Sequence, residues 1–291
     1  MHIVHARHLG MCFGVRDAIA LARAEAEAGP LTILGELVHN ATVSADLSAR
    51  GVQIVHDVAQ VTTAKVMVTA HGVSERTLAS TRRLGFTVVE ATCPLVHTAH
   101  KGVRALVRDG YHPVIVGQRD HVEVRGLTGD LDDFDVVLNE DDVRALREHA
   151  RIGVAAQTTQ PIEKVRRLVA LIRERFPRSE VRFVDTVCQP TKQRQDAAAD
   201  LARQCDVVVV IGGANSNNTR ELVRTCSRYC RRVHHVQTAA DLCAEWFLDA
   251  RSVGITAGTS TPDAVIELVD GRIRELDALL SAPPVGAAES R

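Results

Sequence analysis

The 291-residue sequence has few aromatic side chains, almost no net charge and no long apolar run. Aromatic residues make up 3% of the chain, which leaves few platforms for stacking the bases of single-stranded nucleic acid. Lysine and arginine (35) nearly balance aspartate and glutamate (36), so no strong basic field favours nucleic acid. No apolar run approaches the roughly 18 residues of a membrane-spanning helix, and no signal-peptide pattern opens the sequence. We therefore expect a cytoplasmic protein that binds neither nucleic acid nor membrane.

The seven cysteines lack the close pairs that mark zinc fingers and zinc ribbons. No two of them form a C-x-x-C pair, although this does not exclude a zinc site assembled in three dimensions. An odd number of cysteines in a chain of this length fits a reducing compartment better than a disulfide framework.

Short apolar stretches alternate with amphipathic stretches along the whole chain. β-branched runs predict strands, and apolar residues near i, i+3, i+4 and i+7 predict helices. The expected strands are residues 2–8, 31–34, 52–55, 66–69, 86–90, 114–117, 153–156, 181–184, 207–211, 233–236 and 253–256. The expected helices are residues 15–28, 74–84, 96–108, 162–176, 190–204, 221–231, 239–248 and 262–280. This alternation predicts an α/β fold with mainly parallel sheets.

Three cysteines follow predicted strands and precede predicted helices: Cys12, Cys93 and Cys188. A helix N-terminus favours a thiolate, and Pro94 fits the first position of its helix. The three cysteines divide the chain into near-equal thirds, which suggests a threefold arrangement that converges on one centre. We therefore expect three similar α/β domains, residues 1–93, 94–188 and 189–281, followed by a disordered tail at residues 282–291.

Polar side chains gather where the predicted strands end, and open α/β sheets bind ligands at that edge. They are His39, His71, His121, Glu123, Thr158, Thr159, Ser216, Asn217, Asn218 and Ser260. Loops of serine, threonine and asparagine that enter helices suit phosphate. Taken singly, such a histidine is more often a structural hydrogen-bonding group, and such a loop is more often a helix cap. Their conjunction with the three cysteines favours a functional site.

The other four cysteines are expected to pack in the core. Cys226 and Cys230 share a helical face, but two thiols lack the four ligands of a structural zinc site. Cys205 opens a predicted strand, and Cys243 lies inside a predicted amphipathic helix. The three junction cysteines instead suit a soft metal centre, either an iron–sulfur cube with one open iron or zinc with three cysteines and a water.

A series of short motifs, in order from residue 1 to about residue 280, resembles the IspH (LytB) family. The motifs are Gly10-Met-Cys12-Phe-Gly14-Val15, Leu37-Val-His39-Asn40, Ala70-His71-Gly72-Val73-Ser74, Ala91-Thr-Cys93-Pro94-Leu95-Val96, His121-Val-Glu123-Val-x-Gly126, Gln157-Thr158-Thr159, Asp185-Thr-Val-Cys188, Asn215-Ser-Asn-Asn218 and Thr256-Ala-Gly-Thr-Ser260. The family frequently has His-Pro-Glu where this chain has His121-Val-Glu123, and Arg-Gly-Phe-Cys-Ala where it has Leu9-Gly-Met-Cys12-Phe. Neither change removes a ligand.

The resemblance implies a 4-hydroxy-3-methylbut-2-enyl diphosphate reductase with three α/β domains in a pseudo-threefold cloverleaf around a central [4Fe–4S] cluster. It implies that Cys12, Cys93 and Cys188 hold the cluster and that Glu123, beside Thr158, donates a proton. The residues implied for binding the diphosphate substrate are His39, His71, His121, Thr159, Ser216, Asn217, Asn218 and Ser260. Ferredoxin or flavodoxin would supply electrons, and the products would be isopentenyl and dimethylallyl diphosphate.

Two other functions stay open: a paralogous iron–sulfur reductase of another diphosphate, and a non-catalytic sensor with a labile cluster or zinc. A sensor has no need for a proton relay, so Glu123 and Thr158 disfavour it, whereas the motifs do not separate the two reductases. Beside a diphosphate, Glu123 is expected to be protonated because nearby negative charge raises the pKa of a carboxyl. That is the state which an acid catalyst needs.

Overall fold

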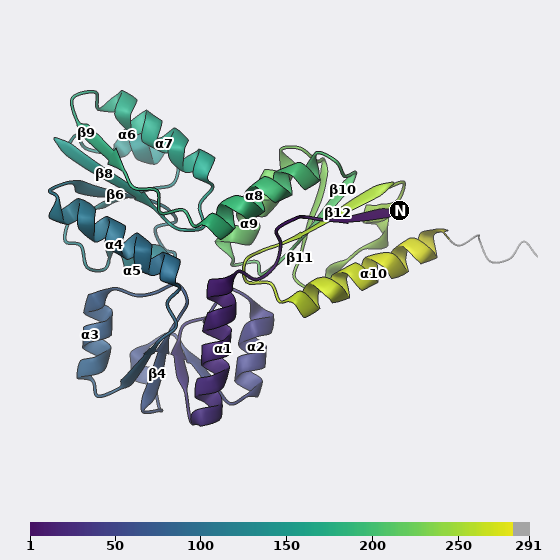
Figure 1. The fold of residues 1–291 in the computed structure, drawn as a ribbon, viewed down its shortest axis with the longest axis horizontal. Coiled ribbons are helices and arrows are strands. Elements are labelled where there is room, and N and C mark those ends of the chain that lie inside the picture. Colours follow the sequence, from purple (N-terminus) through teal and green to yellow (C-terminus); the bar gives the residue numbers. More distant parts are fainter. Residues whose placement is uncertain (282–291) are drawn as a thin grey trace, which may run out of the picture. The chain divides into compact units, whose positions relative to one another are not determined.

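The computed structural model describes residues 1–281, which contain three sheets of four parallel strands each (Figure 1). This confirms the predicted α/β class; the predicted tail, residues 282–291, lies outside the described residues. The chain forms two compact units, one of residues 11–193 and the other of residues 1–10 with the described residues from 194 onward. Among the described helices, none combines the length and the apolar character that a membrane span requires.

The first sheet of the 11–193 unit has the strand order β3-β2-β4-β5. Ile33 lies opposite Met67 in neighbouring strands, and neither side chain is exposed, so the centre of the sheet is packed on both faces. The strands are β2 (Thr32–Leu34), β3 (Gln53–Val55), β4 (Lys65–Val68) and β5 (Thr87–Glu90). The helices of this half are α1 (Phe13–Ala28), α2 (Ala41–Ala49), α3 (Glu75–Arg83) and the 3₁₀ turn η1 (Val58–Gln60).

The second sheet of this unit has the order β7-β6-β8-β9. Its strands are β6 (His112–Val116), β7 (Asp135–Val137), β8 (Arg151–Ala156) and β9 (Glu180–Phe183). Its helices are α4 (Pro94–Arg108), α5 (Val122–Thr128), α6 (Glu140–Ala145) and α7 (Ile162–Arg175), and α8 (Gln189–Ala202) leads on into the other unit. Helix α4 packs against β6 and β8, and its buried face carries Val96, Val103 and Leu106.

Contacts near the strand ends tie the two halves of the 11–193 unit together. Gly126 in α5 lies against the loop after β4, where a Cβ atom on Gly126 would be 3.2 Å from the Gly72 carbonyl oxygen. Asp130 accepts hydrogen bonds from the Glu75 and Arg76 amides, each at 2.9 Å, and so caps helix α3. The helix that carries Glu123 is therefore fixed against the loop that carries His71.

The other unit contains the sheet β1-β12-β10-β11. Its strands are β1 (His2–His5), β10 (Val207–Ile211), β11 (Arg232–Val236) and β12 (Ser252–Ala257). Its remaining elements are α9 (Asn217–Ser227), α10 (Asp263–Ser281) and the 3₁₀ turns η2 (Ala239–Asp241) and η3 (Ala244–Phe247). Strand β1 pairs with β12, which places residues 1–10 with the last third of the chain rather than with the first. The division into three domains stays a prediction.

The prediction of a single helix at residues 239–248 is wrong, because two short 3₁₀ turns occupy this stretch. Asp241 accepts hydrogen bonds from the Gln237 and Thr238 amides, which closes a capping box around a single turn. Cys243 is consequently exposed and not a core residue. The prediction also missed helices α2, α5 and α6 and strand β7, which are too short or too polar for a clear periodic pattern.

Candidate active site

Each of the three junction cysteines begins a helix, and all three belong to the 11–193 unit. Cys12 and Cys93 are the N-caps of α1 and α4, and Pro94 takes the first position of α4 as predicted. The Thr191 amide donates to the Cys188 carbonyl oxygen at 3.0 Å in the first turn of α8. All three thiols are free and partly buried.

The electrostatics of the three thiols show that the fold brings them together. Burial raises the pKa of Cys93, and it raises the pKa of Cys188 to about 11. The nearby Cys12 and Glu123 raise both values further. Gly14 lies directly against one of these thiols, because a Cβ atom on Gly14 would be 2.4 Å from the Cys93 Sγ atom. Any side chain at Gly14 would therefore displace the sulfur.

Cys93 experiences two opposing effects: the helix N-terminus favours a thiolate, as expected, and burial disfavours it. The Leu95 and Val96 amides do lower the pKa of Cys93, as a helix start should, but burial outweighs them. Thiols in such surroundings keep their protons unless a cation replaces them, and soft metal ions bind thiolates well. Three such sulfurs, with the space beside Cys93 kept clear by Gly14, fit a thiolate-held metal centre.

Glu123 lies in the first turn of α5 and is 1% exposed. Burial raises its pKa from 4.5 to about 7, and hydrogen bonds from the backbone and side chain of Thr158 limit the rise. The Thr158 amide donates to the Glu123 Oε1 atom at 2.6 Å. A nearby diphosphate was expected to raise this pKa, but burial alone suffices. The carboxyl can therefore both hold and release a proton near neutral pH.

Three imidazoles from separate segments meet in the same unit. The ring centroids of His39 and His71 are 4.3 Å apart, and those of His121 lie 5.1 Å and 5.6 Å from them. Burial lowers the pKa of His71 well below its usual value, and the two other imidazoles add to this effect. The Glu123 amide donates to the His121 Nδ1 atom at 3.1 Å, which leaves the His121 proton on Nε2. The histidines converge as the sequence predicted.

A buried glutamine network supports these residues and was missed by the sequence analysis. Gln157 follows β8 and accepts hydrogen bonds at its Oε1 atom from the Gln118 amide (3.2 Å) and from Gln160 (3.0 Å). Its Nε2 atom donates to the Thr159 hydroxyl at 3.2 Å. The network joins the end of β8 to the loop that leads into α5. A glutamine directly after the buried run 152–156 of β8 was the available signal.

Glu36 is a second residue that the sequence analysis missed. Its Oε2 atom lies 2.8 Å from the His39 Nδ1 atom. A neutral imidazole has only one N–H, so His39 can donate to this carboxylate and also to an anionic ligand only when both its nitrogens are protonated. Glu36 can therefore orient the His39 ring.

The remaining predicted residues lie in the other unit, at the carboxyl ends of β10 and β12. Ser216 caps helix α9, Asn217 and Asn218 form its first turn, and Ser260 follows β12. The Thr259 amide donates to the Asn218 Oδ1 atom at 3.0 Å, which joins the two loops. The Asn218 Nδ2 atom is buried and has no hydrogen-bond partner among the described residues. Such a donor suits an anionic ligand.

Three of the four other cysteines are buried in one apolar cluster, as predicted. They are Cys205, Cys226 and Cys230. Burial raises the pKa of Cys205 to about 11 and that of Cys226 to about 12, as in thiols that serve only for packing.

Comparison with known proteins gives one consistent result. The family model described as LytB protein matches residues 3–274. A protein of Pelobacter propionicus named 4-hydroxy-3-methylbut-2-enyl diphosphate reductase is 37% identical over 279 residues, which cover 95% of this chain and 99% of that protein.

Two solved structures are also similar. One is described as (E)-4-hydroxy-3-methyl-but-2-enyl diphosphate reductase, the terminal enzyme of the non-mevalonate pathway. It is 36% identical, has a TM-score of 0.68, and the match covers 94% of this chain and 100% of that one. The other is an E-1-hydroxy-2-methyl-but-2-enyl-4-diphosphate reductase from Plasmodium falciparum. It is 24% identical, has a TM-score of 0.87, and the match covers 99% of this chain and 93% of that one. At that identity the second structure supports the fold alone.

Proposed function

The chain belongs to the LytB family, and we propose that its reductase chemistry takes place where the three cysteines adjoin Glu123. The protein is a 4-hydroxy-3-methylbut-2-enyl diphosphate reductase of the non-mevalonate pathway. The reaction takes up two electrons and two protons, releases the substrate hydroxyl as water, and yields isopentenyl and dimethylallyl diphosphate. The observation that carries the proposal is a buried, protonatable carboxyl beside three convergent thiols.

In this proposal, Cys12, Cys93 and Cys188 hold a [4Fe–4S] cluster, and Gly14 leaves room beside Cys93. When bound through three cysteines, such a cluster supplies single electrons and one iron that is open to the substrate oxygen. Ferredoxin or flavodoxin is the proposed source of the electrons. Buried reduced thiols are consistent with a cytoplasmic location.

Glu123 is the proposed proton donor to the departing hydroxyl. Its pKa of about 7 means that the carboxyl is protonated in a large fraction of molecules and that re-protonation costs little. Thr158 makes backbone and side-chain hydrogen bonds to this carboxyl. Both bonds stabilise the carboxylate that remains after the proton has been given up, because donors to the charged form lower a pKa.

Both units carry residues that are proposed to bind the diphosphate. In the 11–193 unit, His39 and His121 are the proposed ligands beside His71, and Glu36 orients the His39 ring. His71, which is neutral, adds a hydrogen bond without a buried charge. In the other unit, the backbone amides at the start of α9 and the Asn218 Nδ2 atom suit phosphate oxygens. The full proposed set is His39, His71, His121, Thr159, Ser216, Asn217, Asn218 and Ser260.

The test is turnover of 4-hydroxy-3-methylbut-2-enyl diphosphate by the anaerobically reconstituted protein with a chemical reductant. Glu123→Gln keeps the size of the side chain but cannot deliver a proton, so turnover should fall by roughly 10²–10⁴. Glu163→Gln, an exposed change in the first turn of α7, is the matched control and should keep wild-type turnover.

Two results would count against this assignment. Wild-type turnover by Glu123→Gln would move the proton source to another group or to solvent. A wild-type protein that holds a cluster but ignores this substrate would point to another diphosphate. Inorganic pyrophosphate should compete with the substrate, which locates the anion site independently of the chemistry.

A further inference from the structure

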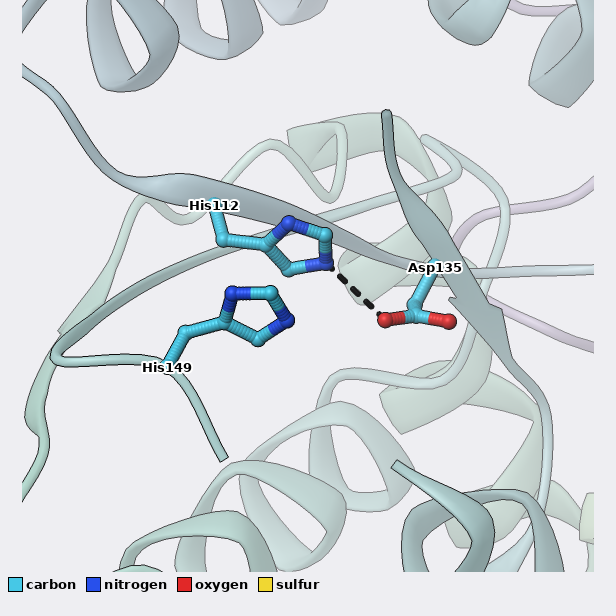
Figure 2. A group of neighbouring side chains, drawn as sticks. All are labelled: His112, Asp135 and His149. Atoms are coloured by element: carbon cyan, nitrogen blue, oxygen red, sulfur yellow. Dashed lines mark hydrogen bonds and ion pairs between the residues drawn. The ribbon is translucent and has the colours of Figure 1, made fainter. Parts of the chain in front are cut away.

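Figure 2 shows three neighbouring side chains of types that can bind a metal ion. They lie at the edge of the second sheet opposite the end of β6 that leads to Glu123. His112 opens β6, Asp135 opens β7, and His149 lies shortly before β8. These are the amino ends of the strands, whereas Thr158 and the loop into α5 follow the carboxyl ends. The group is therefore separate from the proposed active site and plays no part in the reaction described above.

Each of the three side chains offers one ligand atom, and these atoms lie close together. The His112 Nε2 atom is 2.9 Å from the Asp135 Oδ2 atom, and one ligand atom from each residue lies within 4.8 Å of the others. The two imidazoles are stacked, with ring centroids 3.7 Å apart and planes 3° from parallel. The His112 side chain is 8% exposed, so water screens this group only partly.

Carboxylates lie on both sides of the His112 ring. Its Nδ1 atom lies 3.5 Å from the Asp133 Oδ2 atom, so both ring nitrogens face carboxylates. A neutral imidazole has one N–H, and the other nitrogen would then direct a lone pair at a carboxylate oxygen. A metal ion on the Nε2 side, with the Nδ1 proton directed at Asp133, would satisfy both ring nitrogens.

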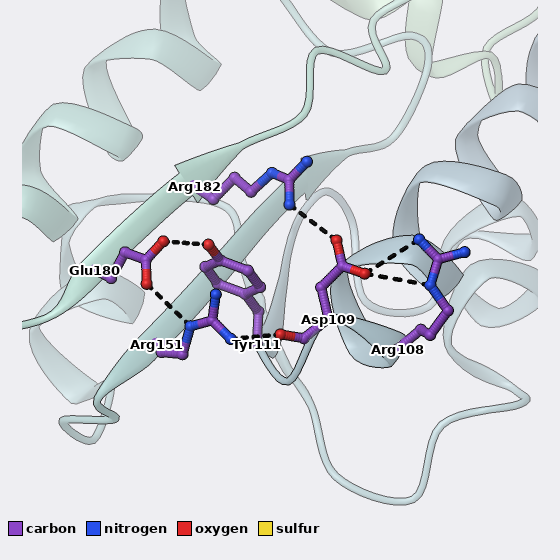
Figure 3. A network of polar contacts seen from close by, with 6 residues as sticks. All are labelled: Arg108, Asp109, Tyr111, Arg151, Glu180 and Arg182. Atoms are coloured by element: carbon purple, nitrogen blue, oxygen red, sulfur yellow. Dashed lines mark hydrogen bonds and ion pairs between the residues drawn. The ribbon is translucent and has the colours of Figure 1, made fainter.

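The neighbouring ion pairs at this edge use arginine, not histidine, as the partner of the carboxylates (Figure 3). There Glu180 is neutralised by Arg151, and Asp109 is neutralised by Arg108 and Arg182. A guanidinium is permanently charged and cannot bind a metal ion, whereas imidazoles can exchange a proton for one.

We propose that His112, Asp135 and His149 bind a divalent transition-metal ion of the Zn²⁺ type. Two imidazole nitrogens and one carboxylate oxygen are a donor set that zinc accepts, with a water in the fourth position. Asp133 takes the outer position, since a ligating histidine usually passes its other N–H to a carboxylate, which fixes the ring.

Binding requires one local movement. An ion bound by both rings must lie close to the plane of each ring. Because the two rings are now parallel, one of them has to rotate until the two planes meet at the ion. His149 lies outside the strands, in the segment between α6 and β8, whereas His112 is held in β6. His149 is therefore the ring that turns. The bound ion would then join β6, β7 and the segment before β8.

The experiment is an anaerobic titration of the reconstituted protein with Co²⁺ as the spectroscopic probe, followed by Zn²⁺ competition. A nitrogen and oxygen site gives visible d–d bands without the near-ultraviolet charge transfer of cobalt bound to sulfur. Wild type should show one such equivalent. His149→Gln should weaken Co²⁺ binding by more than the roughly tenfold expected for Asp133→Asn. His56→Gln, an exposed change in the same unit, should bind like wild type.

Asp135→Asn keeps the shape of the site and provides a second ligand variant if His149→Gln alters the fold, which circular dichroism will report. The proposal is overturned if cobalt shows only sulfur charge transfer. It is equally overturned if both ligand variants bind Co²⁺ like wild type.

Discussion

Replacing Glu123 by glutamine should remove a specific part of the pH dependence of folding stability. The carboxyl is 1% exposed, and burial raises its pKa from 4.5 to about 7. The folded protein therefore binds this proton more tightly than the unfolded chain does. Glutamine has a similar size and can still accept the Thr158 amide, but it does not titrate.

The sign and size of the effect follow from linkage. A raised pKa in the folded state stabilises the fold fully below about pH 4.5, and this contribution is lost as the pH rises through 7. A shift from 4.5 to about 7, at roughly 1.4 kcal/mol per pKa unit, corresponds to about 3 kcal/mol. Between pH 5 and pH 8, the wild type should therefore lose up to about 3 kcal/mol relative to Glu123→Gln.

The assay is urea unfolding of the metal-free protein at several pH values between 5 and 8, followed by circular dichroism. The quantity to read is the difference in unfolding free energy between variant and wild type, because other titrating groups cancel in it. Glu163→Gln, whose side chain is exposed, should give a difference that does not change with pH.

A difference for Glu123→Gln that stays constant from pH 5 to pH 8 would refute the reasoning. The carboxyl would then have an ordinary pKa in the fold and would be ionised at neutral pH. The proton source that the proposed reaction needs would be absent. If the prediction holds, turnover should also decline above about pH 7, as the acid form of Glu123 is depleted.

Three further changes test the surroundings of the site. Gly14→Ala should lower the iron content after anaerobic reconstitution, because the added methyl would lie 2.4 Å from the Cys93 Sγ atom; wild-type iron content would contradict this. Cys93→Ser should strip or destabilise the cluster, whereas Cys226→Ser, in the apolar core, should keep the visible absorption of the cluster. Glu36→Gln should raise KM roughly tenfold with little change in kcat, because the His39 ring loses the charged partner that orients it; a fall in kcat alone would assign Glu36 to the chemistry.

The α/β class and the candidate residues could be derived from the sequence because both depend on local patterns. Valine-rich runs such as residues 207–211 are buried strands, and Cys12 and Cys93 begin helices as their flanking residues predict. Polar residues after these strands also converge as parallel topology requires, since the strand ends share one edge. His39 and His71 meet for this reason, whereas His121 follows β6 of the second sheet and joins them because α5 packs against the loop after β4.

Only the tertiary structure decided which residues share a sheet and which environment sets their chemistry. Strand β1 pairs with β12, near the other end of the chain, and no local pattern encodes a contact over that separation. The pKa of Glu123 is set by burial and that of Cys93 by burial against the weaker effect of its helix, and burial depends on the whole fold. The contacts of Glu36 with His39 and of Gln157 with Gln118 could not be predicted from the sequence either. Packing, and not spacing along the chain, determines which polar groups meet.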